Sequence, residues 1–152
     1  MKRSKILNAE LNHAIATMGH GDLMIVCDAG FPIPDTVWRI DLAIKQDLPD
    51  LETILSLIAE DFIAEKVSYA NEMAANNPAL LEKVRRLFPD ADHAPIPHAD
   101  ILGGIARQAK AVVRTGAFDP WGNILLYSGV DVPKWFSKPG VIVPESYRKW
   151  MR

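Results

Sequence analysis

Short apolar runs alternate with amphipathic stretches along the 152 residues of the chain. The clearest run is Leu23–Cys27, five apolar residues in succession, which is typical of a strand covered on both faces. Residues 36–44 alternate between apolar and polar side chains and predict a second strand with one wetter face. Two further short apolar runs predict strands at 111–114 and 124–127.

The segment 62–69 is ambiguous in this pattern. Its β-branched residues, Ile63 and Val67, favour a strand, whereas the Ala-Glu-Lys between them favours a helix. We predict a strand.

Apolar residues at helical spacing predict four helices. The first begins after Asn8, a good N-cap residue, and stops at Gly19. A second begins at Asp50 or Pro49. A third begins at Asn77-Pro78, where an Asx cap is followed by a proline at the first helical position. The last covers residues 100–109.

Loops join these elements. Residues 28–35 contain one glycine and two prolines, and residues 90–97 contain two prolines, so both segments are predicted to be connections. Helices that alternate with short apolar strands predict a layered α/β domain with a largely parallel sheet.

The pattern changes after residue 130. Three prolines interrupt a tail that holds four aromatic residues, Trp135, Phe136, Tyr147 and Trp150. Aromatic side chains are costly to leave in water, so we expect the tail to pack on its own domain or on another subunit, with a frayed terminus as the alternative. The chain therefore divides into a domain at 1–130 and a C-terminal extension at 131–152.

Composition and charge narrow the function classes. A chain with 49% hydrophobic and 24% charged residues is expected to fold around a core. The net charge is −2 and the 17 Lys and Arg residues are scattered, which argues against a nucleic-acid partner. No apolar run approaches the roughly 18 residues of a membrane span, and polar residues interrupt any signal peptide after Leu7, so no membrane partner is expected. The single cysteine, Cys27, lies in an apolar strand, which suggests a reducing compartment, and we expect a cytoplasmic protein.

Two titratable residues bound the Leu23–Cys27 strand. His20 lies in a glycine-rich turn before it, and an imidazole is the usual group for proton transfer near neutral pH. Asp28 follows the strand where a loop opens, the ordinary place for a site in an α/β sheet. Because the strand separates them, they need not meet within one subunit. The alternatives are a solvated turn histidine and a loop aspartate that caps local amides.

Further along the chain, His98 follows a proline and precedes a predicted helix, although a single histidine of this kind is commonly a surface residue. The Trp121-Gly122-Asn123 segment offers a flat aromatic ring, a backbone that a ligand can approach closely and a side-chain amide that both donates and accepts hydrogen bonds. Those groups suit a polyhydroxylated ligand, and a plain turn is the alternative.

Other chemistries are less well supported. Asp92, His93 and His98 suggest a metal, but no second cluster with regular ligand spacing supports one. A Cys27 nucleophile is disfavoured because a thiol inside an apolar strand would have a raised pKa. The chain carries neither common phosphate-binding glycine loop.

Several motifs in order resemble the D-ribose pyranase and L-fucose mutarotase family over about residues 5–130, with the ribose branch closer. The motifs are Leu7-Asn8, Met18-Gly19-His20-Gly21-Asp22, Cys27-Asp28-Ala29-Gly30-Phe31-Pro32-Ile33-Pro34, Arg39-Ile40-Asp41, Asn77-Pro78, Arg114-Thr115-Gly116 and Pro120-Trp121-Gly122-Asn123-Ile124-Leu125-Leu126.

The resemblance implies a three-layer α/β/α sandwich with a largely parallel mixed sheet, assembled as a ring-shaped homodecamer with sugar sites at subunit interfaces. It implies an isomerase that interconverts cyclic forms of a free monosaccharide, most simply D-ribose, without a cofactor. By motif, His20 would be the proton donor, and Asp28, His98 and the Trp121-Gly122-Asn123 segment would bind sugar. The alternatives are an L-fucose mutarotase and a non-catalytic sugar-binding or transport-accessory protein.

The chain departs from the family pattern at two places. The family usually has tyrosine where this chain has Trp121, which removes a phenolic hydroxyl and adds bulk. The extension at 131–152 also continues past the usual family end.

Overall fold

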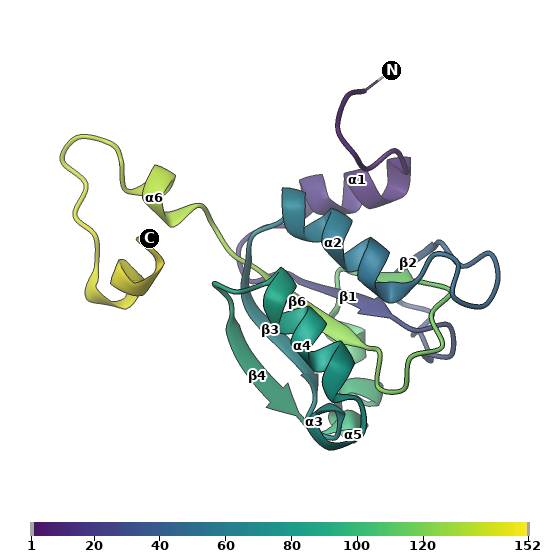
Figure 1. Ribbon diagram of the computed structural model, residues 1–152. Coiled ribbons are helices and arrows are strands. Elements are labelled where there is room, and N and C mark those ends of the chain that lie inside the picture. The colour runs from purple at the N-terminus through teal and green to yellow at the C-terminus, as the bar shows by residue number, and fades with distance from the viewer. Residues whose placement is uncertain (1, 152) are drawn as a thin grey trace.

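The computed structural model describes residues 2–151, which form a mixed sheet with helices on both faces (Figure 1). The sheet has six strands in the order β2-β5-β1-β6-β3-β4. The strands are β1 Leu23–Cys27, β2 Trp38–Asp41, β3 Ala64–Ala70, β4 Asp92–Ile96, β5 Ala111–Arg114 and β6 Ile124–Ser128. The β1–β5, β2–β5 and β3–β4 pairs are parallel, and β6 runs antiparallel to both β1 and β3. Five strands therefore point one way, which confirms the largely parallel mixed sheet.

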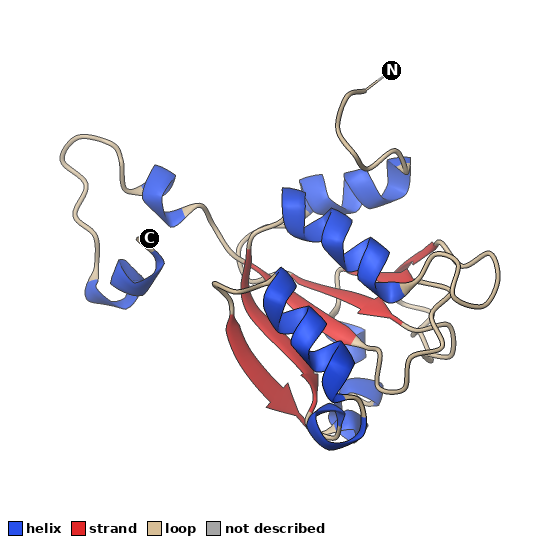
Figure 2. Cartoon of the chain, in the orientation of Figure 1, coloured by secondary structure: helices blue, strands red, loops and turns tan. Residues whose placement is uncertain are grey.

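Helices lie in the connections from β2 to β3, from β3 to β4 and from β4 to β5, whereas loops join β1 to β2 and β5 to β6 (Figure 2). The helices are α1 Ala9–Thr17, α2 Leu51–Asp61, α3 Met73–Asn76, α4 Pro78–Leu87, α5 His98–Leu102 and α6 Val132–Trp135, with 3-10 turns η1 Ile105–Gln108 and η2 Glu145–Trp150. The predicted caps are present, because the side chains of Asn8, Asp50 and Asn77 each accept a backbone N–H in the first turn of α1, α2 and α4. Among residues 2–151, even the longest helix, with 11 residues, is too short to cross a bilayer.

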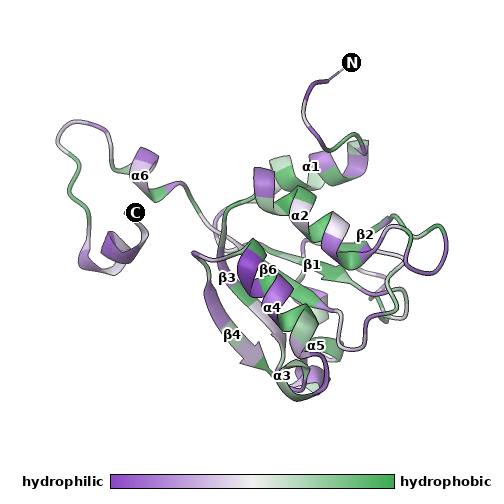
Figure 3. Cartoon of the chain, viewed as in Figure 1, coloured by the Kyte–Doolittle hydropathy of each residue, from purple (hydrophilic) through white to green (hydrophobic). Residues whose placement is uncertain are grey.

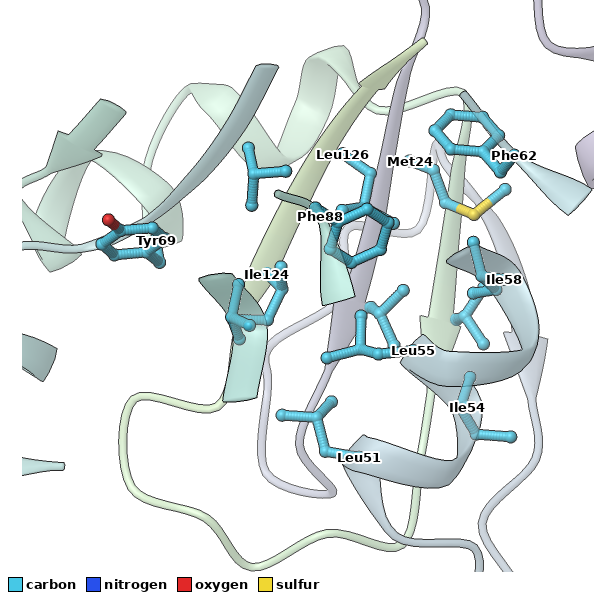
Figure 4. Packing of buried hydrophobic residues seen from close by; sticks show 14 of the residues in the cluster. Met24, Leu51, Ile54, Leu55, Ile58, Phe62, Tyr69, Phe88, Ile124 and Leu126 are labelled. Carbon is cyan, nitrogen blue, oxygen red and sulfur yellow. The ribbon is translucent and has the colours of Figure 1, made fainter. Parts of the chain in front are cut away.

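The core lies in two layers, one on each face of the sheet. β1 is uniformly hydrophobic (Figure 3) and sends alternate side chains to both faces. Met24 belongs to the buried cluster that includes the apolar faces of α1, α2 and α4, and Figure 4 shows it beside Ile58 of α2 and Phe62. Ile25 belongs to the cluster on the other face, with Ile101 of α5 and Ala106 of η1. Helices on both sides of one sheet confirm the three-layer sandwich.

Two predicted segments were wrong. Residues 90–97 are not a connection, because β4 pairs there with β3 at the edge of the sheet. Pro95 is tolerated because an edge strand has one side without hydrogen-bonded neighbours. The helix predicted at 100–109 begins at His98 and breaks after Leu102, where two glycines lower helix propensity.

Other boundaries were nearly right. The ambiguous 62–69 segment is the strand β3, as predicted, and the 36–44 strand shortens to β2. After β6 the extension leaves the sheet and reaches away from the helical layers (Figure 1), and Lys149 Nζ lies 2.5 Å from Asp92 Oδ2 of β4.

Candidate active site

One edge of the sheet collects most of the candidate residues. Asp28 directly follows β1, His98 lies two residues after the end of β4, and Asn123 directly precedes β6. Because β6 is antiparallel to the other strands, its start lies at the same edge as the ends of β1 and β4. Open α/β sheets commonly bind ligands at this carboxyl edge.

Asp28 is half-buried at this edge. Its Oδ1 accepts the Gly30 N–H at 2.8 Å, and the Asn123 side chain also donates to the carboxylate. Burial nevertheless raises the pKa of the Asp28 carboxyl above its ordinary value of 3.8, and these hydrogen bonds only partly oppose the shift. The site thus holds a carboxylate that is partly removed from water.

Two buried polar atoms beside Asp28 lack partners. Within residues 2–151, neither His98 Nε2 nor Asn123 Oδ1 has a hydrogen-bond partner, although Asn123 is only 2% exposed. Leaving such an atom unpaired costs about 1–3 kcal/mol. The unpaired acceptor and ring nitrogen mark positions where a polar ligand would complete the hydrogen bonding.

The loop before β6 is held in an unusual conformation. Trp121 has a φ of +59°, a left-handed value that bulky residues rarely adopt. Gly122 follows, and a Cβ there would lie 2.8 Å from the Asp119 carbonyl oxygen, so the close approach requires glycine. Asn77, the cap of α4, donates from Nδ2 to the Pro120 carbonyl at 3.1 Å and ties the loop to that helix.

The backbone on either side of Asp28 is bonded to the segment that directly follows β5. Thr115 Oγ1 donates to the Cys27 carbonyl at 2.8 Å, and the Ala29 N–H donates to the Ala117 carbonyl at 2.9 Å. These bonds hold the residues on either side of Asp28.

His20 lies at the opposite edge. Its turn extends the β1–β6 ladder, because the Gly21 N–H donates to the Ser128 carbonyl at 2.7 Å and the Ser128 N–H donates to the Asp22 carbonyl at 2.8 Å. The Asp22 carboxylate accepts the Gly19 N–H at 2.7 Å and is paired with Lys110 at 2.6 Å, which lowers the pKa of Asp22. The His20 side chain is about a third exposed at 36%.

The sequence-based candidates therefore fall into two groups. Asp28, His98 and the Trp121-Gly122-Asn123 segment lie at one edge, and His20 lies at the other. A five-residue strand spans about 16 Å, so one chain does not bring His20 to Asp28. Two copies of the chain are needed to combine both groups.

One contact of His20 was missed from the sequence. Its Nε2 lies 2.7 Å from Glu65 Oε2, on β3. Nothing in the local pattern around Glu65 indicates this contact, because it depends on how β3 pairs with β6.

The rival chemistries find no support in the geometry. Across the residues that the structure describes, His, Cys, Asp and Glu side chains form no group of three that could hold a metal ion, and His93 Nε2 lies 3.0 Å from the Phe88 carbonyl oxygen. Burial strongly raises the pKa of the Cys27 thiol, which disfavours the thiolate that a nucleophile needs.

Known proteins are similar to this chain over most of its length. The model of the RbsD / FucU transport protein family matches residues 1–131. D-ribose pyranase 1 of Streptomyces griseus is 56% identical over 147 residues, 97% of each chain, and D-ribose pyranase 2 of Rubrobacter xylanophilus is 55% identical over 148 residues, 97% of this chain and 96% of that protein.

A solved structure of Bacillus subtilis RbsD complexed with D-ribose superposes with a TM-score of 0.81 at 37% identity. It covers 86% of this chain and 98% of its own, so the extension is shared with the two longer pyranases and has little counterpart in that structure. The chain belongs to the RbsD / FucU transport protein family.

Proposed function

We propose that this chain is a D-ribose pyranase, an isomerase that interconverts the pyranose and furanose forms of free D-ribose without a cofactor. The observation that carries the proposal is the pair of unpartnered buried atoms, His98 Nε2 and Asn123 Oδ1, beside the Asp28 carboxylate. They lie in a chain 55–56% identical to two D-ribose pyranases over nearly its whole length.

The sugar binds at the edge of the sheet that holds Asp28. The Asp28 carboxylate accepts sugar hydroxyls, and Asn123 Oδ1 and His98 Nε2 gain the partners they lack. Trp121 supplies an apolar surface for the C–H face of the sugar, and Gly122 keeps the backbone close enough to hold it there.

His20 supplies the proton for ring opening. When a pyranose opens, the anomeric hydroxyl loses a proton, the bond between the anomeric carbon and the ring oxygen breaks, and the ring oxygen gains a proton. The product is the open-chain aldehyde, which recloses through another hydroxyl. His20 protonates the ring oxygen, and water takes the proton from the anomeric hydroxyl.

The site is completed by a second subunit. His20 and Asp28 lie at opposite edges of one sheet, so a His20 from a neighbouring copy faces Asp28. Large apolar side chains at the Asp28 edge, Ile44 at 78% exposed and Phe118 at 62%, fit an interface between copies. We propose a homodecameric ring, as the family resemblance implies.

Two further proposals concern the setting of the protein. We propose that residues 1–130 form the catalytic domain and that 131–152 is an extension, since the ribose-bound relative matches this chain over 86% of its length. A chain ending at residue 131 is then expected to retain sugar exchange. We also propose a cytoplasmic location, because a buried free thiol such as Cys27 suits a reducing compartment.

Saturation-transfer NMR on D-ribose and on L-fucose tests the activity. Exchange between ribose ring forms that accelerates with protein concentration supports the pyranase. Faster exchange of fucose alone would indicate an L-fucose mutarotase. Ribose binding with uncatalysed exchange would indicate a sugar-binding protein without turnover.

His20→Ala tests the role of the imidazole. It is expected to abolish exchange while the protein stays folded by circular dichroism. His13→Ala is the matched control, because His13 is also exposed but lies on α1 against Trp38, and it is expected to keep the full rate. Full exchange in the His20 variant would remove His20 from the mechanism.

A further inference from the structure

Glu65 interrupts the regular pairing of β3 with β6. Ala64 pairs with Ser128 and Lys66 pairs with Tyr127, so Glu65 is the extra residue of a β-bulge. Bulges are common next to active sites, where they redirect a side chain. Here the bulge frees Glu65 from the alternation that its neighbours follow.

A glycine leaves space for the Glu65 side chain. A Cβ on Gly129 would lie 2.9 Å from Glu65 Cβ and 3.2 Å from its backbone nitrogen. The Gly129 N–H donates to the Ile63 carbonyl at 2.8 Å and holds the chain at this close approach. The bulge and the glycine together fix where Glu65 projects.

His20 is tied to the same end of β6. Gly21 and Asp22 bond to both backbone groups of Ser128, the residue before Gly129. The imidazole and the Glu65 carboxylate therefore meet, with Nε2 2.7 Å from Oε2, and both side chains are only partly exposed, at 36% and 35%.

We propose that Glu65 is the positioning residue for the proton transfer by His20, an inference that rests on the catalytic role proposed for His20. Its carboxylate accepts the Nε2–H of the imidazole. This bond fixes the tautomer and the ring plane and leaves Nδ1 as the nitrogen that exchanges a proton with the sugar.

A plain surface ion pair is the competing explanation. An exposed pair contributes little and needs no special backbone geometry. The Glu65 contact instead depends on a bulge, a glycine with no room for a methyl group and two ladder bonds that hold the facing turn. The neighbouring Lys66 lies over the Tyr127 ring at 3.6 Å, and the His20 imidazole lies at hydrogen-bond distance from Glu65.

The test compares Glu65→Ala with Glu65→Gln in the full chain, using D-ribose exchange. Glu65→Ala is expected to lower kcat by at least about tenfold with little change in KM, since a proton-transfer group contributes roughly 10²–10⁴-fold and loses its orientation here. Glu65→Gln keeps an oxygen that accepts the Nε2–H and is expected to recover part of kcat. Glu52→Gln, which breaks a 2.7 Å pair with Lys83 between α2 and α4, is the matched control and is expected to keep the wild-type rate.

A second measurement follows the imidazole directly and needs no turnover. In protein labelled with ¹⁵N-histidine, the ring nitrogens of neutral His20 are expected to report the Nε2–H tautomer alone in the wild type and in Glu65→Gln, and both tautomers in Glu65→Ala. Unchanged ring signals in Glu65→Ala would overturn the positioning role, as would an unchanged kcat. If the wild-type protein does not accelerate ribose exchange, the proposed function fails, and the ring signals still decide whether Glu65 orients His20.

Discussion

The folded environment of Asp28 disfavours the ionised form of its carboxyl group. Burial raises the pKa of its carboxyl, whereas carboxylates in folded proteins more often have lowered values. A raised folded pKa means that the contribution of Asp28 to stability is fully present below about pH 3.8 and is lost as the pH rises through the folded value. The ionised form of Asp28, the form proposed to bind sugar, is therefore held at a cost to stability.

Ribose affinity is expected to depend on the ionisation of Asp28. The carboxylate is the stronger acceptor for sugar hydroxyls, so the dissociation constant of D-ribose should rise as the pH falls toward the raised pKa of Asp28. Titration calorimetry between pH 7 and pH 4 measures this change. Affinity that stays constant from pH 7 to pH 4 would contradict a role for this carboxylate.

Gly122→Ala is expected to damage the loop before β6. The added Cβ would lie 2.8 Å from a backbone oxygen of Asp119, and forcing extra atoms into a packed site costs about 1–3 kcal/mol. Ribose binding should weaken and the thermal midpoint should fall. Gly104→Ala is the control, because open space surrounds that position and its φ of −78° is ordinary. Equal behaviour of the two variants would show that the close approach at Gly122 is unimportant.

At the scale of elements, helix caps connect stability to the site. Asn77 caps α4 and also holds the Pro120 carbonyl of the Trp121 loop, whereas Asn8 caps only α1. Each change to alanine should cost about 1 kcal/mol through the lost cap. Asn77→Ala alone should also raise KM for ribose, measured by exchange NMR. A similar KM in both variants would exclude the proposed link between α4 and the loop.

The features that the sequence predicted are local ones. The caps at Asn8, Asp50 and Asn77 and the apolar run of β1 depend on residues a few positions apart, so single-sequence reasoning found them. The separation of His20 from Asp28 was predictable for the same reason, since one strand lies between them.

The features that the sequence missed depend on distant pairing. β4 contains a proline and becomes a strand only because it lies beside β3 at the sheet edge. Glu65 reaches His20 because of a bulge against β6, some sixty residues later in the chain, and no local pattern encodes that register. The roles of the site residues came from the family resemblance and remain proposals.

At the scale of the whole molecule, two chains must come together for the proposed site to form. One copy has the proposed binding residue Asp28 at one edge of the sheet and the proposed proton-transfer pair, His20 and Glu65, at the other edge, about 16 Å away along β1. A closed ring with repeated identical interfaces would place the second edge of each subunit against the first edge of its neighbour. Each interface would then hold one complete site.

Mixed assemblies test this arrangement most directly. His20→Ala and Asp28→Ala chains are each expected to form inactive assemblies, and both are co-expressed in equal amounts so that their subunits mix. If a site takes His20 from one chain and Asp28 from another, about a quarter of the sites in a random mixture are intact, and ribose exchange should return to about a quarter of the wild-type rate. Mixed assemblies that stay as inactive as the two single variants would contradict a site shared between subunits.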